Sequence, residues 1–91
     1  MSEKANIVFI IVSRADYEDS DYTSIHSVHM NIESMNRELA QIKEQYRADK
    51  SIDIIGEQWY RGEFYHVTYM DMRMNRKYTR RYDVETHETA D

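Results

Sequence analysis

Four carboxylates lie close together early in the chain, and oxygen ligands of this kind bind hard cations such as calcium and magnesium. They are Asp16, Glu18, Asp19 and Asp21. A calcium loop of the EF-hand type needs glycine at its sixth position and glutamate at its twelfth, but Asp21 and Ser27 stand there. The spacing therefore predicts no metal site. We expect an acidic loop over residues 15–22 that is solvated or contacts a basic partner.

Histidine is the other residue type that could ligate a metal or transfer a proton near neutral pH. His26 and His29 are three residues apart, which places them on one face of a helix but on opposite faces of a strand. His66 and His87 lie elsewhere, and the chain has no cysteine. We interpret all four as ordinary surface or core histidines, with a helical His26 and His29 pair as the open alternative.

Catalytic motifs are missing from the sequence. There is no phosphate-binding glycine loop and no serine elbow, and two glycines are too few to shape a tight backbone site. Seventeen acidic residues allow some carboxylate pair in space, but the spacing singles out none. We therefore predict a non-enzymatic chain without catalytic residues, cofactor or metal, with a metal-dependent hydrolase as a remaining alternative.

The strongest charge signal is a run of five cations without a carboxylate at residues 73–82, in a chain of net charge −5. These cations could pair with carboxylates on neighbouring strands, bind a protein, or neutralise phosphates while tyrosines stack on bases. Tyrosine, tryptophan, methionine and arginine are enriched at protein interfaces, and an acidic chain is a poor general binder of nucleic acid. We predict a partner-binding set of Trp59, Tyr65, Tyr69, Arg73, Arg76, Lys77, Tyr78, Arg80, Arg81 and Tyr82. The alternative is an RNA-binding or single-stranded-DNA-binding domain that uses the basic hairpin 73–82.

The elements that must position these residues follow from the hydrophobic pattern. Asn31 is a good N-cap, and the apolar residues after it recur with the period of a helix: Ile32, Met35, Leu39, Ile42 and Tyr46. Strands are expected at 6–14, at 24–30, at 52–55 and 57–60 on either side of Gly56, at 64–74 and at 78–86, with turns at 61–62 and 75–77.

These elements predict an α+β fold in which one amphipathic helix packs on a small, mainly antiparallel sheet. We expect a single domain over residues 1–91, with an ordered core of about 5–86 and a frayed tail at 87–91. The rings of Trp59, Tyr65, Tyr69, Tyr78 and Tyr82 are too many for one helix to cover. We therefore expect the other face of the sheet to be open and to favour a homodimer.

The apolar run at residues 7–12, the short strand that leads directly into a helix, and the tyrosine-rich closing hairpin resemble small uncharacterised β-β-α-β-β accessory proteins of bacteria and their phages. The resemblance implies a protein that binds and blocks a host protein, such as an enzyme or a component of a defence system. The apolar run is too short to span a bilayer, so we expect no membrane association and a cytoplasmic location, in the host if a phage encodes the chain.

Overall fold

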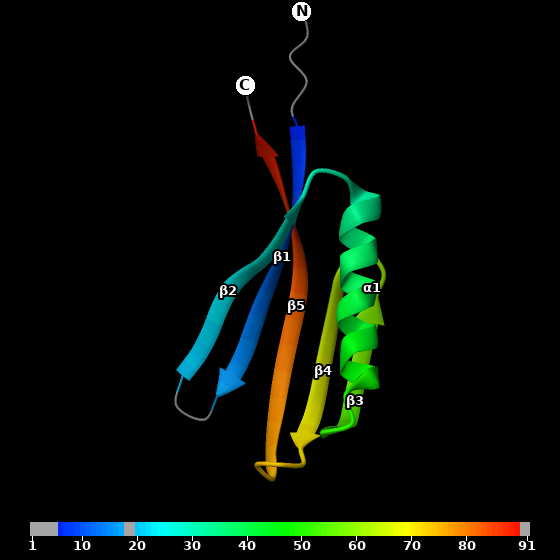
Figure 1. Ribbon diagram of the computed structural model, residues 1–91. Helices are drawn as coiled ribbons and strands as arrows, with labels where there is room; N and C mark the ends of the chain where they lie inside the picture. Colours follow the sequence, from blue (N-terminus) through cyan, green and yellow to red (C-terminus); the bar gives the residue numbers. More distant parts are fainter. Residues whose placement is uncertain (1–5, 18–19, 90–91) are drawn as a thin grey trace, which may run out of the picture.

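A computed structural model describes residues 6–17 and 20–89, which form two strands, a helix and three further strands (Figure 1). The strands form one antiparallel sheet in the order β2-β1-β5-β4-β3, and the helix lies across one face of it. The predicted α+β fold is confirmed. The elements are β1 (Asn6–Tyr17), β2 (Ser20–His29), α1 (Ile32–Ala48), β3 (Ile52–Tyr60), β4 (Phe64–Asp71) and β5 (Arg76–Thr89).

Helix α1 begins and ends at residues that cap it. The side chain of Asn31 accepts a hydrogen bond from the backbone N–H of Ser34 at 2.8 Å, a cap that contributes about 1 kcal/mol. Between this cap and the last turn, the helical spacing brings one apolar stripe onto the sheet, as the sequence predicts. Its buried members are Met35, Leu39 and Ile42, each at most 3% exposed.

The core lies between α1 and the sheet face that α1 packs on, which we call the covered face. The sheet contributes Ile11, Tyr65, Val67 and Tyr82 to this core. Full burial of one such side chain contributes about 1.5–3 kcal/mol. Since side chains alternate along a strand, the residues between these point to the opposite side. No element of the described residues packs on that side, which we call the open face.

The two turns of the β3–β4–β5 meander depend on left-handed backbone. Gly62, with φ of 82°, lies in the turn at 61–63 and confirms the predicted hairpin there. The next turn spans residues 72–75, and Asn75 takes φ of 53°. Arg76 and Lys77 already belong to β5, so the predicted turn at 75–77 was placed too late.

The acidic segment at 15–22 is mostly strand, so its prediction as a loop is wrong. β1 continues to Tyr17, β2 begins at Ser20, and Asp16 pairs in register with Asp21. On its other side Asp16 pairs with Thr79 of β5. Ladder hydrogen bonds on both sides of β1 outweigh the low strand preference of aspartate. Glu18 and Asp19 lie outside the described residues.

The C-terminal strand is also longer than predicted. β5 continues to Thr89, which pairs with Asn6 at the start of β1. The prediction of a frayed tail is therefore wrong for residues 87–89, because β1 supplies a partner strand along their whole length. Residues 90–91 lie outside the described part of the chain.

Candidate functional site

Four tyrosines meet where the C-terminal half of α1 lies on the covered face. The ring centre of Tyr46 lies 6.0 Å from that of Tyr65, 5.5 Å from Tyr69 and 6.0 Å from Tyr82. The hydroxyls of Tyr46 and Tyr82 are 2.8 Å apart. Tyr65 is 0% exposed and Tyr82 is 5% exposed, so both are unavailable to a partner at the surface. Their prediction as contact residues is wrong, because α1 covers these rings.

The electrostatics of this tyrosine cluster are those of a structural site. Burial, and then the hydrogen bond with Tyr82, raise the pKa of Tyr46 far above its ordinary value. Burial also raises the pKa of Tyr65, whose hydroxyl donates to Glu57 at 2.7 Å. The guanidinium of Arg47 holds the pKa of the Glu57 carboxyl below its usual range through hydrogen bonds. Both phenols are thus neutral at physiological pH, and the chain Arg47–Glu57–Tyr65 ties α1 to β3 and β4.

A hollow of about 320 Å³ opens beside the tyrosine cluster. Two of its lining groups, the hydroxyls of Tyr46 and Tyr82, bond to each other. A third, the carboxylate of Asp49, accepts hydrogen bonds from the side chain and backbone of Ser51, which lower its pKa. These groups are already partnered, so they do not converge on a ligand position as a catalytic set would.

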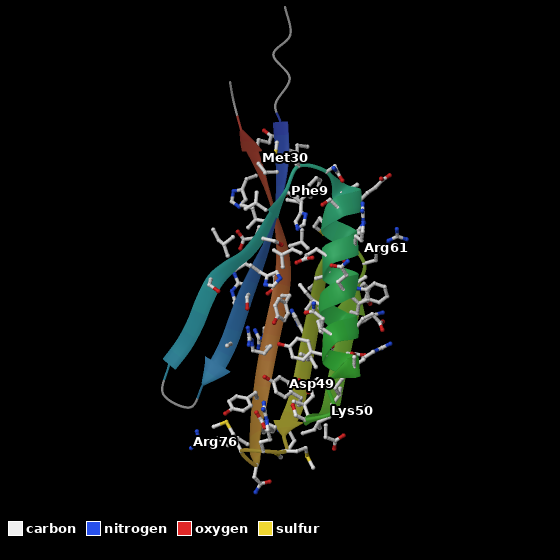
Figure 2. The ribbon with its side chains drawn as sticks, in the orientation of Figure 1. Phe9, Met30, Asp49, Lys50, Arg61 and Arg76 are labelled. Carbon is white, nitrogen blue, oxygen red and sulfur yellow. The ribbon has the colours of Figure 1, made fainter. Side chains whose placement is uncertain are left out.

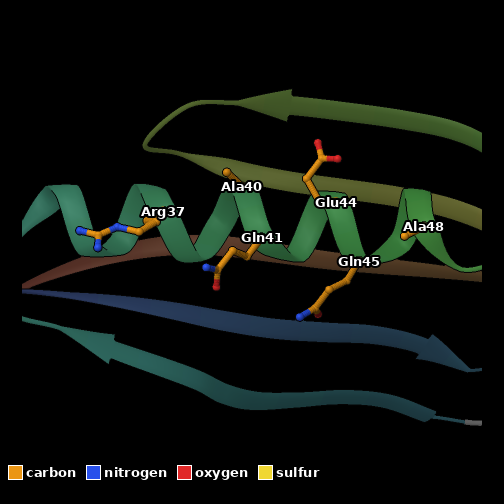
Figure 3. Close-up of a pocket in the computed structure, with 6 residues that line it drawn as sticks. All are labelled: Arg37, Ala40, Gln41, Glu44, Gln45 and Ala48. Atoms are coloured by element: carbon orange, nitrogen blue, oxygen red, sulfur yellow. The ribbon is translucent and has the colours of Figure 1, made fainter.

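Figure 3 shows a second hollow, of about 430 Å³, along α1. Every residue that lines it belongs to the helix itself, so no second element supplies an opposing wall. A ligand there would be held from one side only, unlike the concave sites in which small molecules bind. This hollow carries no chemistry. Its lining residues are Arg37, Ala40, Gln41, Glu44, Gln45 and Ala48.

The turn between β4 and β5, together with the first residues of β5, forms a basic end of the molecule, near the label of Arg76 in Figure 2. We call residues 72–77 the basic turn. Oδ1 of Asp71 accepts hydrogen bonds from the backbone N–H groups of Arg73 at 2.9 Å and Met74 at 3.3 Å, which fixes the turn backbone. The side chains point outward: Arg73 is 76% exposed, Met72 is 62% exposed and Met74 is 60% exposed. Arg76 and Lys77 are exposed as well.

The last two cations of the predicted set lie on opposite faces of the sheet. Arg80 is on the covered face, where its Nη2 donates to Oγ of Ser13 at 3.1 Å and its guanidinium carbon lies 5.6 Å from the ring centre of Tyr82. Arg81 is exposed on the open face, in register with Arg14. The five cations therefore do not form one continuous stripe.

The remaining aromatic residues of the predicted set are also separated. Tyr78 is half-buried, and its hydroxyl donates to Sδ of Met74 at 3.7 Å, which places it beside the basic turn. Trp59 is 39% exposed and lies on β3 in register with Tyr65, with Nζ of Lys43 3.6 Å from its ring centre. Trp59 therefore belongs to the side of α1 and not to the basic turn.

The open face carries an ion-pair network that the sequence did not single out. Asp83 accepts from Nη1 of Arg14 at 2.7 Å and lies 2.8 Å from Nε2 of His66. Nη2 of Arg14 also lies 3.4 Å from Glu85. The guanidinium that pairs with Asp83 and Glu85 belongs to Arg14, 69 residues away from Asp83. The ring of Phe64 stacks on His66 with centres 4.3 Å apart.

The described part of the chain supports neither a metal site nor a membrane-spanning helix. Within residues 6–17 and 20–89, no three histidine, aspartate or glutamate side chains gather where they could hold a metal ion. The same residues contain no helix that is long and apolar enough to cross a membrane. The predicted contact role of Asp16, Glu18, Asp19 and Asp21 stays a prediction.

Comparisons of this chain with protein-family models, curated proteins and solved structures give no match. Its function must therefore be argued from its own geometry.

Proposed function

We propose that this chain is a non-enzymatic protein-interaction module that binds an acidic surface of another protein through its basic turn. The observation that carries the proposal is the exposure, on a backbone fixed by Asp71, of three cations next to two methionines. Methionine and arginine are enriched in protein interfaces, and cations steer an anionic partner into contact. A fixed turn also loses little conformational entropy on binding.

The charge distribution around the basic turn supports a defined partner. Among the described residues, Arg76 and Lys77 form no ion pair, and the contact of Arg73 Nε with Asp71 is long at 3.9 Å. Elsewhere the chain is acidic, with a net charge of −5, so an anionic partner is attracted to this end and repelled from others. Binding that blocks a host protein is the mode of action that the resemblance to phage accessory proteins implies.

A protein partner fits this surface better than a single-stranded nucleic acid. Such strands are bound by aromatic side chains on which successive bases stack. Tyr82 is buried in the core, and Tyr78 is half-buried against Met74. The turn thus offers exposed methionines in place of stacking rings.

The proposal is tested by capture followed by titration. The chain is immobilised, exposed to nuclease-treated bacterial lysate, and any retained protein is purified and titrated by calorimetry. We expect Arg73→Glu/Arg76→Glu to weaken its binding by at least about tenfold, and added salt to weaken binding by the wild-type chain. The charge-matched control is Arg37→Glu/Arg61→Glu, because both cations are exposed away from the basic turn. It should leave the affinity within about twofold, as expected for charges outside the contact.

Three outcomes would overturn the proposal. The first is that no protein is retained. The second is that the two double variants weaken the titrated affinity equally. The third is that a labelled single-stranded oligonucleotide binds the chain more tightly than the captured protein does.

A further inference from the structure

The open face is a broad surface of mixed chemistry with no layer over it in the single chain (Figure 1). Val12 is 6% exposed at its centre, shielded by its neighbours on the sheet. Other apolar side chains of this face keep much of their surface in water: Ile25 is 65% exposed, Val28 is 56% exposed and Tyr60, on β3, is 62% exposed. In register with Val12, Asp83 lies between it and Phe64, so apolar and charged side chains are interspersed across the face. Exposed apolar surface of this extent is typical of an interaction site.

The size of the open face matches a stable protein interface. Five strands at a spacing of about 4.8 Å span roughly 24 Å, and the shortest strand, with eight residues, spans roughly 26 Å, for a projected area of roughly 600 Å². Side-chain relief raises the accessible area above the projected one. Stable interfaces bury about 800 Å² on each partner, so the whole face is of the required size.

The charges of the open face are arranged in two neighbouring rows across the strands. In one row, Asp83 is in register with Val12 and Phe64. In the next row, Arg81 is in register with Arg14 and His66. One row is therefore acidic and apolar, and the other holds two guanidinium groups and an imidazole.

These two rows cross the middle of β5 and reach β4 at its first residues. β5 is the middle strand of the five, and Tyr82, which separates Arg81 from Asp83, lies near the middle of β5. A two-fold axis that crosses the strands at this level lays β2, β1 and β5 of one copy over the same strands of the other, whereas β4 and β3 meet only near their ends at Phe64 and Tyr60. It also lays the acidic row of each copy on the cationic row of the other.

We propose that the open face binds a second copy of this chain, face to face, with the two β5 strands antiparallel across the interface. Arg81 of each copy then lies over Asp83 of the other, and the stacked Phe64 and His66 rings of the two copies meet beside the axis. Favourable cation-to-carboxylate and cation-to-ring contacts result at the centre of the interface. If the two-fold axis instead ran along the strands, Arg81 of one copy would lie over Arg81 of the other, and these like charges would oppose assembly.

The proposed function does not depend on this dimer. The two basic turns lie at opposite ends of the dimer, because the β5 strands are antiparallel. Each is available to its own partner, and the assembly would bind two acidic surfaces. The dimer is measured on the pure chain without any partner, so its failure and that of the proposed function are separable.

Light scattering over a concentration series up to hundreds of micromolar measures the monomer–dimer equilibrium. We expect a dimer whose dissociation constant rises at least about tenfold in Arg81→Glu, since a carboxylate then faces Asp83 of the other copy. Ile25→Glu, at a position that is exposed in the single chain, should weaken the dimer similarly without affecting the monomer fold. Arg37→Glu on α1 is the matched control and should leave the equilibrium unchanged. A strict monomer, or a dimer as tight in Arg81→Glu as in the wild-type chain, would overturn the proposal.

The orientation is tested by the distance between nitroxide labels at Lys77→Cys, a unique thiol in a chain without cysteine. Antiparallel β5 strands place the two labels about 35 Å apart, whereas parallel strands place them about 10–20 Å apart. A single short distance would contradict the proposed two-fold axis.

Discussion

The two faces of β4 and β5 are built from alternating residues of the same short segments, yet they differ in what completes them. On the covered face, α1 covers Tyr65 and Tyr82, and Tyr46 supplies a hydrogen-bond partner. On the open face, Phe64 and Asp83 are the immediate neighbours of those tyrosines, and no described element packs on them. The chain itself covers one face and, within the described residues, leaves the other open.

This difference shows why residues 73–82 cannot be interpreted as one binding surface. The period-two alternation of a strand sends Arg80 and Tyr82 towards α1 and Arg81 and Asp83 away from it. The cations of the basic turn, such as Arg76, lie at the end of the β4–β5 hairpin and are exposed. Residues that are adjacent in the sequence therefore have separate roles in the core, at the open face and in the basic turn.

The sharpest contrast compares one tyrosine from each face. Tyr65→Ala should lower the free energy of unfolding by about 3–5 kcal/mol, because it removes a fully buried ring from the core. Tyr60→Ala removes the same atoms from a side chain that is 62% exposed, and we expect a loss below about 1 kcal/mol. Urea unfolding measures both. Equal losses would show that α1 does not cover Tyr65.

The hydroxyl contact within the tyrosine cluster gives a smaller effect. Tyr82→Phe keeps the ring but leaves the hydroxyl of Tyr46 without its partner at 2.8 Å, so we expect a loss of about 1 kcal/mol. Tyr60→Phe is the control, since its hydroxyl is exposed, and should change stability by less than about 0.5 kcal/mol. Thermal unfolding monitored by circular dichroism separates the two. If the Tyr82→Phe chain is as stable as the Tyr60→Phe control, the hydrogen bond between Tyr46 and Tyr82 does not stabilise the core.

The Glu57 carboxyl makes the covered face sensitive to acid. Its folded pKa is lowered, mainly by the hydrogen bonds from Arg47, relative to an unfolded value of about 4.3. Its contribution is therefore fully present above that value and is lost as pH falls through the folded pKa. We expect Glu57→Gln to lose stability at neutral pH and to show a smaller further loss between about pH 5 and pH 3 than the wild-type chain. Glu44→Gln, an exposed control, should keep the wild-type pH profile.

The ion pairs of the open face should contribute least to the folding of the single chain. Asp83 is 26% exposed and Arg14 is 41% exposed, so solvent screens their attraction. We expect Asp83→Asn to cost about 1 kcal/mol or less in monomer stability, with a cost that shrinks further in high salt. Urea unfolding at low and high salt, on chain dilute enough to be monomeric, measures this. A loss as large as that of Tyr65→Ala would mean that the open face stabilises the monomer as strongly as the core does.

The fold could largely be predicted because its signals are local. The spacing of Met35, Leu39 and Ile42 after the cap at Asn31 predicts one helical face, and this face is buried. Gly62 predicts a turn that needs positive φ. The extent of β1 and β2 could not be predicted, because aspartates disfavour strands and β1, which pairs with β2, is held on its other side by β5, far along the chain.

The candidate surfaces were harder to predict because they depend on long-range pairing. Nothing in the sequence indicates that Arg14 meets Asp83, or that α1 covers Tyr65 and Tyr82 while leaving Phe64 open. The cations of the basic turn stand out in the sequence because their closeness to one another is a local property, and they are exposed; their role in binding stays a prediction.

The central claim is that the chain covers one face of its sheet itself and covers the other with a second copy. Hydroxyl-radical footprinting of Phe64 and Tyr65 tests it most directly, because these neighbours lie on opposite faces. Across the concentration range in which light scattering reports dimer formation, the modification rate of Tyr65 should stay low and that of Phe64 should fall several-fold. A Phe64 rate that does not change with concentration, or a Tyr65 rate as high as that of exposed Tyr60, would contradict the claim.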